Sequence, residues 1–64
     1  MEKMYDFLFP FTNEKDAETF VNHTADEWLY CRKVGTEVEV YSIFEKTALE
    51  LLEWVQENNL NLLK

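Results

Sequence analysis

The chain has 64 residues and a net charge of −7, from 13 acidic and 6 basic side chains. Its one Cys and one Gly exclude a disulfide framework, a cysteine-based zinc site and a glycine-rich phosphate loop. Hydrophobic residues make up 47% of the chain, enough to form a core, so we expect one folded domain over residues 1–64. No apolar run is long enough to cross a membrane and no signal-peptide pattern opens the chain, so we expect a cytoplasmic protein.

The first predicted element is a strand, because the segment from Lys3 to Phe11 alternates with a period of two residues. Phe7 and Phe9 fall on one parity and Leu8 on the other, so both faces of the strand carry apolar groups. A strand with two apolar faces is typical of the interior of a sheet, and we expect this one to be central. Pro10 lacks an amide donor and should end the strand near Phe9.

A helix is predicted next. Thr12 or Asn13 offers a side-chain oxygen as a cap, and Glu14 and Asp16 place negative charge in the first turn, where the helix dipole favours it. The buried stripe at helical spacing is Ala17, Phe20, Val21 and Thr24.

The segment from Trp28 to Cys31 is compatible with a longer helix or with a strand. Its β-favouring residues, and the single Gly35 before the alternating residues 36–42, favour two strands joined by a hairpin.

Two registers of this hairpin predict different surfaces. A two-residue turn at Val34-Gly35 places Arg32 opposite Glu37 and turns the aromatic side chains outward. A bulge at Gly35 instead places Tyr30 opposite Val38 and sends the aromatic side chains into the core. We favour the first register, because it pairs opposite charges and keeps the apolar residues of both strands on one face.

A second helix is predicted from the capping-box spacing of Ser42 and Glu45. Asn58-Asn59 can end this helix, because Asn tolerates the left-handed conformation. The segment from Leu60 to Leu63 is either a last helical turn or a short fourth strand. The predicted buried face of the helix is Ala48, Leu49, Leu51, Leu52 and Val55.

These elements predict an α+β fold, a two-layer sandwich in the order β-α-β-β-α with both helices on one face of the sheet. If the C-terminal segment is a fourth strand, the topology is ferredoxin-like.

The other face of the sheet is then open and aromatic, and exposed apolar patches mark binding sites. The alternative is that this face is not open, because strand curvature and the C-terminal segment cover much of it. The residues predicted to bind a partner are Trp28, Tyr30, Arg32, Glu37, Glu39 and Tyr41.

An acidic stripe is predicted on the second helix, where Glu50, Glu53 and Glu57 recur at helical spacing. Two interpretations are open: a mimic of nucleic-acid phosphates, or a solvated face that keeps the protein soluble. The excess of acids opposes direct nucleic-acid binding and favours a partner with a basic surface.

Catalytic and metal-binding patterns are weak. His23, Asp26 and Glu27 lie close in sequence but lack a metal-ligand spacing, and Cys31 in an apolar run is typical of a small buried residue. We therefore predict no enzyme activity, no metal and no cofactor.

The function predicted from these features is a small acidic protein-interaction module that binds and inhibits or regulates a basic partner, such as an inhibitor, an antitoxin or a phage-type regulator. One alternative is a structural homodimer with its sheet faces packed together. A weaker alternative is a small-molecule sensor with a cavity between sheet and helices.

Overall fold

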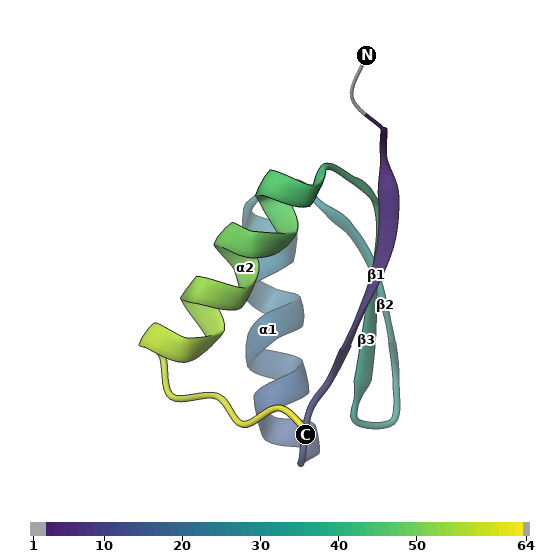
Figure 1. Ribbon diagram of the computed structural model, residues 1–64. Coiled ribbons are helices and arrows are strands. Elements are labelled where there is room, and N and C mark those ends of the chain that lie inside the picture. The colour runs from purple at the N-terminus through teal and green to yellow at the C-terminus, as the bar shows by residue number, and fades with distance from the viewer. Residues whose placement is uncertain (1–2, 64) are drawn as a thin grey trace.

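The computed structural model describes residues 3–63 and confirms the α+β fold in the order β-α-β-β-α. Both helices cover one face of a three-stranded antiparallel sheet and run in opposite directions (Figure 1). The elements are β1 (Tyr5–Pro10), α1 (Glu14–Asp26), β2 (Tyr30–Val34), β3 (Glu37–Ile43) and α2 (Glu45–Glu57).

The central strand is β3, with the order β1-β3-β2, so the expectation that the first strand is central is wrong. The C-terminal segment does not form a fourth strand within the described residues. It makes one antiparallel bridge, between Leu62 and Phe11, and leaves β1 at an edge. Pro10 is part of β1 although it has no N–H. At this position an N–H would face away from β3, and β1 is an edge strand, so no hydrogen bond of the sheet is lost.

The hairpin turn is Gly35-Thr36, so the predicted register is shifted by two residues. Arg32 lies opposite Glu39, not Glu37, and Tyr30 lies opposite Tyr41. The turn has a positive φ only at its first central residue, Gly35 (φ 62°), which is the pattern of a type II′ turn. The predicted turn would have placed a β-branched Val at that position. A shift of two residues leaves every side chain on its predicted face.

A β-bulge bends the end of β3. The pair Tyr5–Ile43 is followed by Phe7–Val40, so β3 has one extra residue, and Ser42 adopts a left-handed φ of 53°. The Ser42 amide donates to Asp6 Oδ1 at 3.0 Å. The capping-box prediction is therefore wrong: α2 begins after Phe44, which makes no side-chain cap hydrogen bond.

The start of α1 follows the sequence prediction, with Asn13 as its cap. The Asn13 Oδ1 accepts a hydrogen bond from the Asp16 amide at 2.9 Å.

Both helices end in the same way, in a Schellman motif. After α1, the amides of Trp28 and Leu29 donate to the carbonyls of Ala25 and Thr24. After α2, the amides of Asn59 and Leu60 donate to the carbonyls of Gln56 and Val55. The left-handed residue of each motif is Trp28 (φ 61°) or Asn59 (φ 58°).

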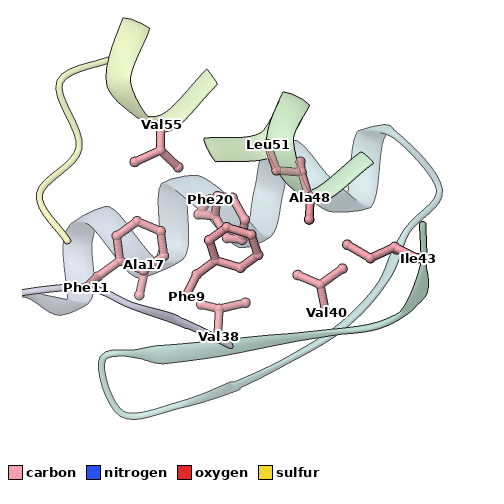
Figure 2. Packing of buried hydrophobic residues seen from close by; sticks show 10 residues of the cluster. All are labelled: Phe9, Phe11, Ala17, Phe20, Val38, Val40, Ile43, Ala48, Leu51 and Val55. Carbon is pink, nitrogen blue, oxygen red and sulfur yellow. The ribbon is translucent and has the colours of Figure 1, made fainter. Parts of the chain in front are cut away.

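The core lies between the sheet and the helices, with Phe20 of α1 at its centre (Figure 2). The Phe20 ring centroid lies 4.7 Å from that of Phe9 and 5.1 Å from that of Phe11. Leu49, predicted to be buried, is 59% exposed, because it lies at the margin of the face that α2 presents to the sheet. The buried apolar residues are Phe9, Phe11, Ala17, Phe20, Val38, Val40, Ile43, Ala48, Leu51 and Val55.

The C-terminal segment packs along the open end of this core, where Leu60 and Leu62 are partly buried. Asn61 donates its amide to Asp16 Oδ2 at 3.0 Å, and its carbonyl accepts from the Thr12 amide at 2.9 Å. Within residues 3–63, neither helix has the length and apolar character needed to cross a membrane.

Candidate functional site

The face of the sheet opposite the helices is uncovered by any other element of residues 3–63 (Figure 1). Because side chains alternate along a strand, the pairing of the three strands fixes which residues lie on this side. We call this surface the open face. It consists of Leu8, Pro10, Tyr30, Arg32, Val34, Glu37, Glu39 and Tyr41.

Two tyrosines form the aromatic part of the open face. Tyr30 and Tyr41 lie directly opposite each other on β2 and β3, with ring centroids 5.8 Å apart and a tilted geometry. Tyr30 is 76% exposed, and Tyr41 is half-buried. The pair therefore offers a large aromatic surface held by the sheet backbone, at little cost in side-chain entropy on binding.

The Tyr41 hydroxyl is fixed by a neighbour on its own strand, because it donates to Glu39 Oε2 at 3.1 Å. Burial raises the pKa of the Tyr41 phenol and the bond to Glu39 raises it further, while Arg32 lowers it. The net pKa lies above the usual value of 10.0, so the phenol stays protonated at neutral pH and keeps the Glu39 carboxylate in place.

A charged row crosses the middle of the open face. Arg32 of β2 lies opposite Glu39 of β3, and Leu8 of β1 lies on the other side of Glu39. Leu8 is 52% exposed and was not among the predicted site residues. Its parity, opposite to that of Phe7 and Phe9, was the available signal in the sequence. Glu37, the remaining predicted residue of this surface, is exposed near the hairpin end.

Trp28 is placed differently from the prediction, because it belongs to no strand. It occupies the left-handed position that ends α1, a position that glycine most often takes. Trp28 is 95% exposed and lies two residues before Tyr30 in the chain. The prediction of a strand over residues 28–31 is therefore wrong for Trp28 and Leu29, since β2 begins at Tyr30.

We expect the substitution Trp28→Gly to stabilise the fold by up to about 1 kcal/mol. Glycine adopts a positive φ without steric cost, whereas an L-residue pays about 1–2 kcal/mol, and the exposed indole contributes little packing in return. Chemical denaturation of the two proteins measures the difference. Ala25→Gly, at an exposed helical position of the same segment, is the matched control and should destabilise the protein. A destabilised Trp28→Gly variant would show that the indole packs on the fold.

A groove of about 490 Å³ lies between the end of α1 and α2, and the predicted acidic stripe forms one side of it. Glu27 of the α1 terminus adds a further carboxylate from the opposite wall. Within the groove the His23 imidazole stacks on the Trp54 indole, with centroids 3.8 Å apart and planes 6° from parallel. The lining residues are His23, Glu27, Leu29, Thr47, Glu50, Leu51, Glu53, Trp54 and Glu57.

Trp54 was not identified from the sequence as a residue of this groove. Its position three residues after Leu51 was the available signal, because that spacing places it beside the buried face of α2. The stack with His23 depends on how two helices pack, which the spacing along one helix does not define.

The weak metal and thiol patterns lead to no assembled centre. Within residues 3–63 no group of three or more His, Cys, Asp or Glu side chains is arranged to hold a metal ion. Cys31 is half-buried, and its Sγ lies 3.1 Å from the Thr24 Oγ1, which also donates to the Val21 carbonyl. The thiol and the His23 ring thus have different partners, and Cys31 packs on the helical side of the sheet.

Comparison with protein-family models, with curated proteins and with solved structures finds no match to this chain.

Proposed function

We propose that the chain is a small acidic binding protein that docks a protein partner with a basic surface on its open face, and so inhibits or regulates that partner. The observation that carries this proposal is the bare sheet face with the Tyr30–Tyr41 pair on it. A small domain has few apolar residues to spare from its core, so an exposed aromatic pair is better explained by binding than by folding. Tyr, Trp and Arg are also the residues that most often dominate interface energies.

The charge of the protein supports a basic partner. The net charge of −7 gives the chain a negative field, and Glu37 and Glu39 place part of it on the open face. Such a field accelerates encounters with a positively charged surface and slows encounters with acidic ones. A partner whose own ligand is anionic, for example a protein that binds nucleic acid, has a surface of this kind.

Trp28 extends the proposed contact surface beyond the sheet. Its position near Tyr30 and its almost complete exposure make it available to a partner. The backbone strain of its left-handed conformation is then a cost that binding compensates. We therefore expect Trp28→Gly to bind the partner more weakly, although we expect it to fold more stably.

The test is affinity capture of the partner from the native cell, followed by binding measurements with the purified pair. We expect Tyr30→Ala to weaken binding about tenfold or more, because it removes an exposed aromatic contact without touching the core. Leu49→Ala is the matched control, since it truncates an exposed apolar side chain on the helical layer, and it should bind normally. Equal losses from both variants would contradict docking on the open face.

A second arm distinguishes the open face from the acidic groove. The triple substitution of Glu50, Glu53 and Glu57 by Gln removes three charges from the helical layer. If those acids only steer the encounter, association slows, the salt dependence weakens and dissociation is unchanged. Fast dissociation of the triple variant, together with normal binding by Tyr30→Ala, would place the contact in the groove.

The same bare face also supports a homodimer in which two sheets pack together. Sedimentation of the purified chain across a dilution series separates the two functions. A partner-binding monomer stays folded when diluted, whereas a face-packed dimer dissociates and is weakened by Tyr30→Ala.

A further inference from the structure

The outer edge of β1 is a second surface on which the structure places unpaired backbone groups. The Phe11 amide donates to the Thr36 carbonyl of the chain segment that leads into β3, so the odd residues of β1 direct their backbone groups toward β3. By alternation, the N–H and C=O groups of Asp6 and Leu8 face outward. Such an edge is a template for another strand.

This edge already accepts an extended segment at one end. The Leu63 amide donates to the Pro10 carbonyl at 2.8 Å, and the Thr12 amide donates to the Asn61 carbonyl at 2.9 Å. The C-terminal segment, as far as Leu63, therefore lies antiparallel along the last residues of β1. Within residues 3–63, no strand covers the edge from Tyr5 to Phe9.

An apolar groove of about 290 Å³ follows the same edge between β1 and α2. Leu49, exposed although it belongs to the helical layer, lies on its wall together with Leu52 and Leu62. Glu45 is the one ionisable residue among the groove residues. On a molecule with a charge of −7, this groove is close to neutral.

We propose that a second copy of the chain pairs with this edge, β1 against β1 and antiparallel, about a two-fold axis at Phe7. The two sheets then form one continuous sheet. This interface uses the backbone edge of β1, whereas the proposed partner docks on the side chains of the open face. Leu8 belongs to both surfaces, but the inference does not depend on the proposed partner.

The register about Phe7 is selected by charge and by the C-terminal segment. It places Asp6 opposite Leu8 of the second copy, so that their outward N–H and C=O groups bond and the two Asp6 carboxylates stay apart. Centring on Asp6 would place the two carboxylates opposite each other. Centring on Leu8 would pair Asp6 with Pro10, which has no N–H and whose carbonyl is already bonded to Leu63.

The same register pairs aromatic side chains on the helical side of the sheet. Phe7, which is partly buried, faces Phe7 of the second copy, and the exposed Tyr5 lies opposite the position of the buried Phe9. Asp6 is the one acidic or basic residue of this strand, and the Ser42 amide already donates a hydrogen bond to its carboxylate. The strand is thus self-complementary in hydrogen bonding, in charge and in the aromatic pair at Phe7.

The dimer should respond to salt in the opposite way from partner capture. Two chains of like net charge repel each other, and salt screens this repulsion. We therefore expect dimerisation to strengthen as salt rises from low to physiological strength, whereas association with a basic partner should slow.

The experiment is sedimentation equilibrium of the full chain over a dilution series. We expect Leu8→Pro to weaken the dimer about tenfold or more, because each copy loses an outward N–H that β3 does not use. Lys33→Pro, on the outer edge of β2, is the matched control and should dimerise normally. A wild-type chain that stays monomeric at high concentration and physiological salt would overturn the proposal.

A cross-linking arm covers the case in which Leu8→Pro fails to fold. In a Cys31→Ser background, Phe7→Cys places two thiols at a non-hydrogen-bonded pair, where opposing Cα atoms are about 4.5 Å apart. Mild oxidation should link the chains through this position. Leu8→Cys should not link them, because Leu8 faces Asp6. Linking by Leu8→Cys alone, or a dimer sensitive to Tyr30→Ala but not to Leu8→Pro, would refute this register.

Discussion

The substitution Phe20→Ala is expected to lower the free energy of unfolding by about 3–5 kcal/mol, which is most of the stability of a domain this size. Phe20 is fully buried and lies against Phe9, Phe11 and Trp54. It thereby joins α1 to the first strand and to the second helix. Removing its ring leaves a cavity that the helix cannot close, because three elements of a small fold pack around it.

Urea denaturation followed by circular dichroism measures this loss. Leu49→Ala, an exposed truncation on α2, should change the stability by no more than about 0.5 kcal/mol. Phe20→Leu should fall between the two, because it keeps much of the buried volume. A Phe20→Ala protein with the midpoint of the wild type would mean that α1 does not pack on the sheet through this residue.

The substitution Asp16→Ala is expected to cost about 2 kcal/mol, the size of a lost hydrogen bond to a charged group. The Asp16 Oδ2 accepts the Asn61 amide at 3.0 Å and the Asn13 Nδ2 at 3.2 Å. One carboxylate thus holds the C-terminal segment against the start of α1. Without the Asp16 carboxylate, the Asn61 amide loses its acceptor. Leu60 and Leu62, on either side of Asn61, should then be released from the core margin.

Hydrogen exchange distinguishes this effect from a general loss of stability. The Asn61 and Leu63 amides should exchange faster in Asp16→Ala, while the amides of β3 keep their protection at matched global stability. Glu14→Ala removes a neighbouring acid of the same helical turn, and should cost only the smaller dipole contribution. If both variants behaved alike, charge at the helix terminus would account for the whole effect.

The periodicity of the sequence was sufficient to assign the faces of the sheet, because a shift of two residues in the hairpin leaves parity unchanged. It was not sufficient for the register, which depends on the backbone conformation of Gly35 and Thr36. Tyr30, Arg32, Glu37, Glu39 and Tyr41 therefore share one surface as predicted, although their cross-strand partners differ.

The assignment of the central strand failed for a different reason. The two apolar faces of β1 suggested burial on both sides, but Leu8 remains half exposed while Phe9 is buried. Strand order is a property of long-range pairing, and composition does not distinguish an interior strand from an edge that binds something else. Trp28 is a similar case, because its aromatic character favoured a strand, whereas the hydrogen bonds that end α1 place it in a turn.

The position of β3 between its two neighbours has a consequence for the newly synthesised chain. β1 is synthesised before α1 and β2, yet its partner strand β3 leaves the ribosome only after them. During that interval Phe7, Phe9 and Phe11 have no sheet to join, and such a segment is prone to aggregate or to be bound by a chaperone. The hairpin of β2 and β3 pairs locally as soon as it emerges, so release of the completed β3 is the step that ends this vulnerable period.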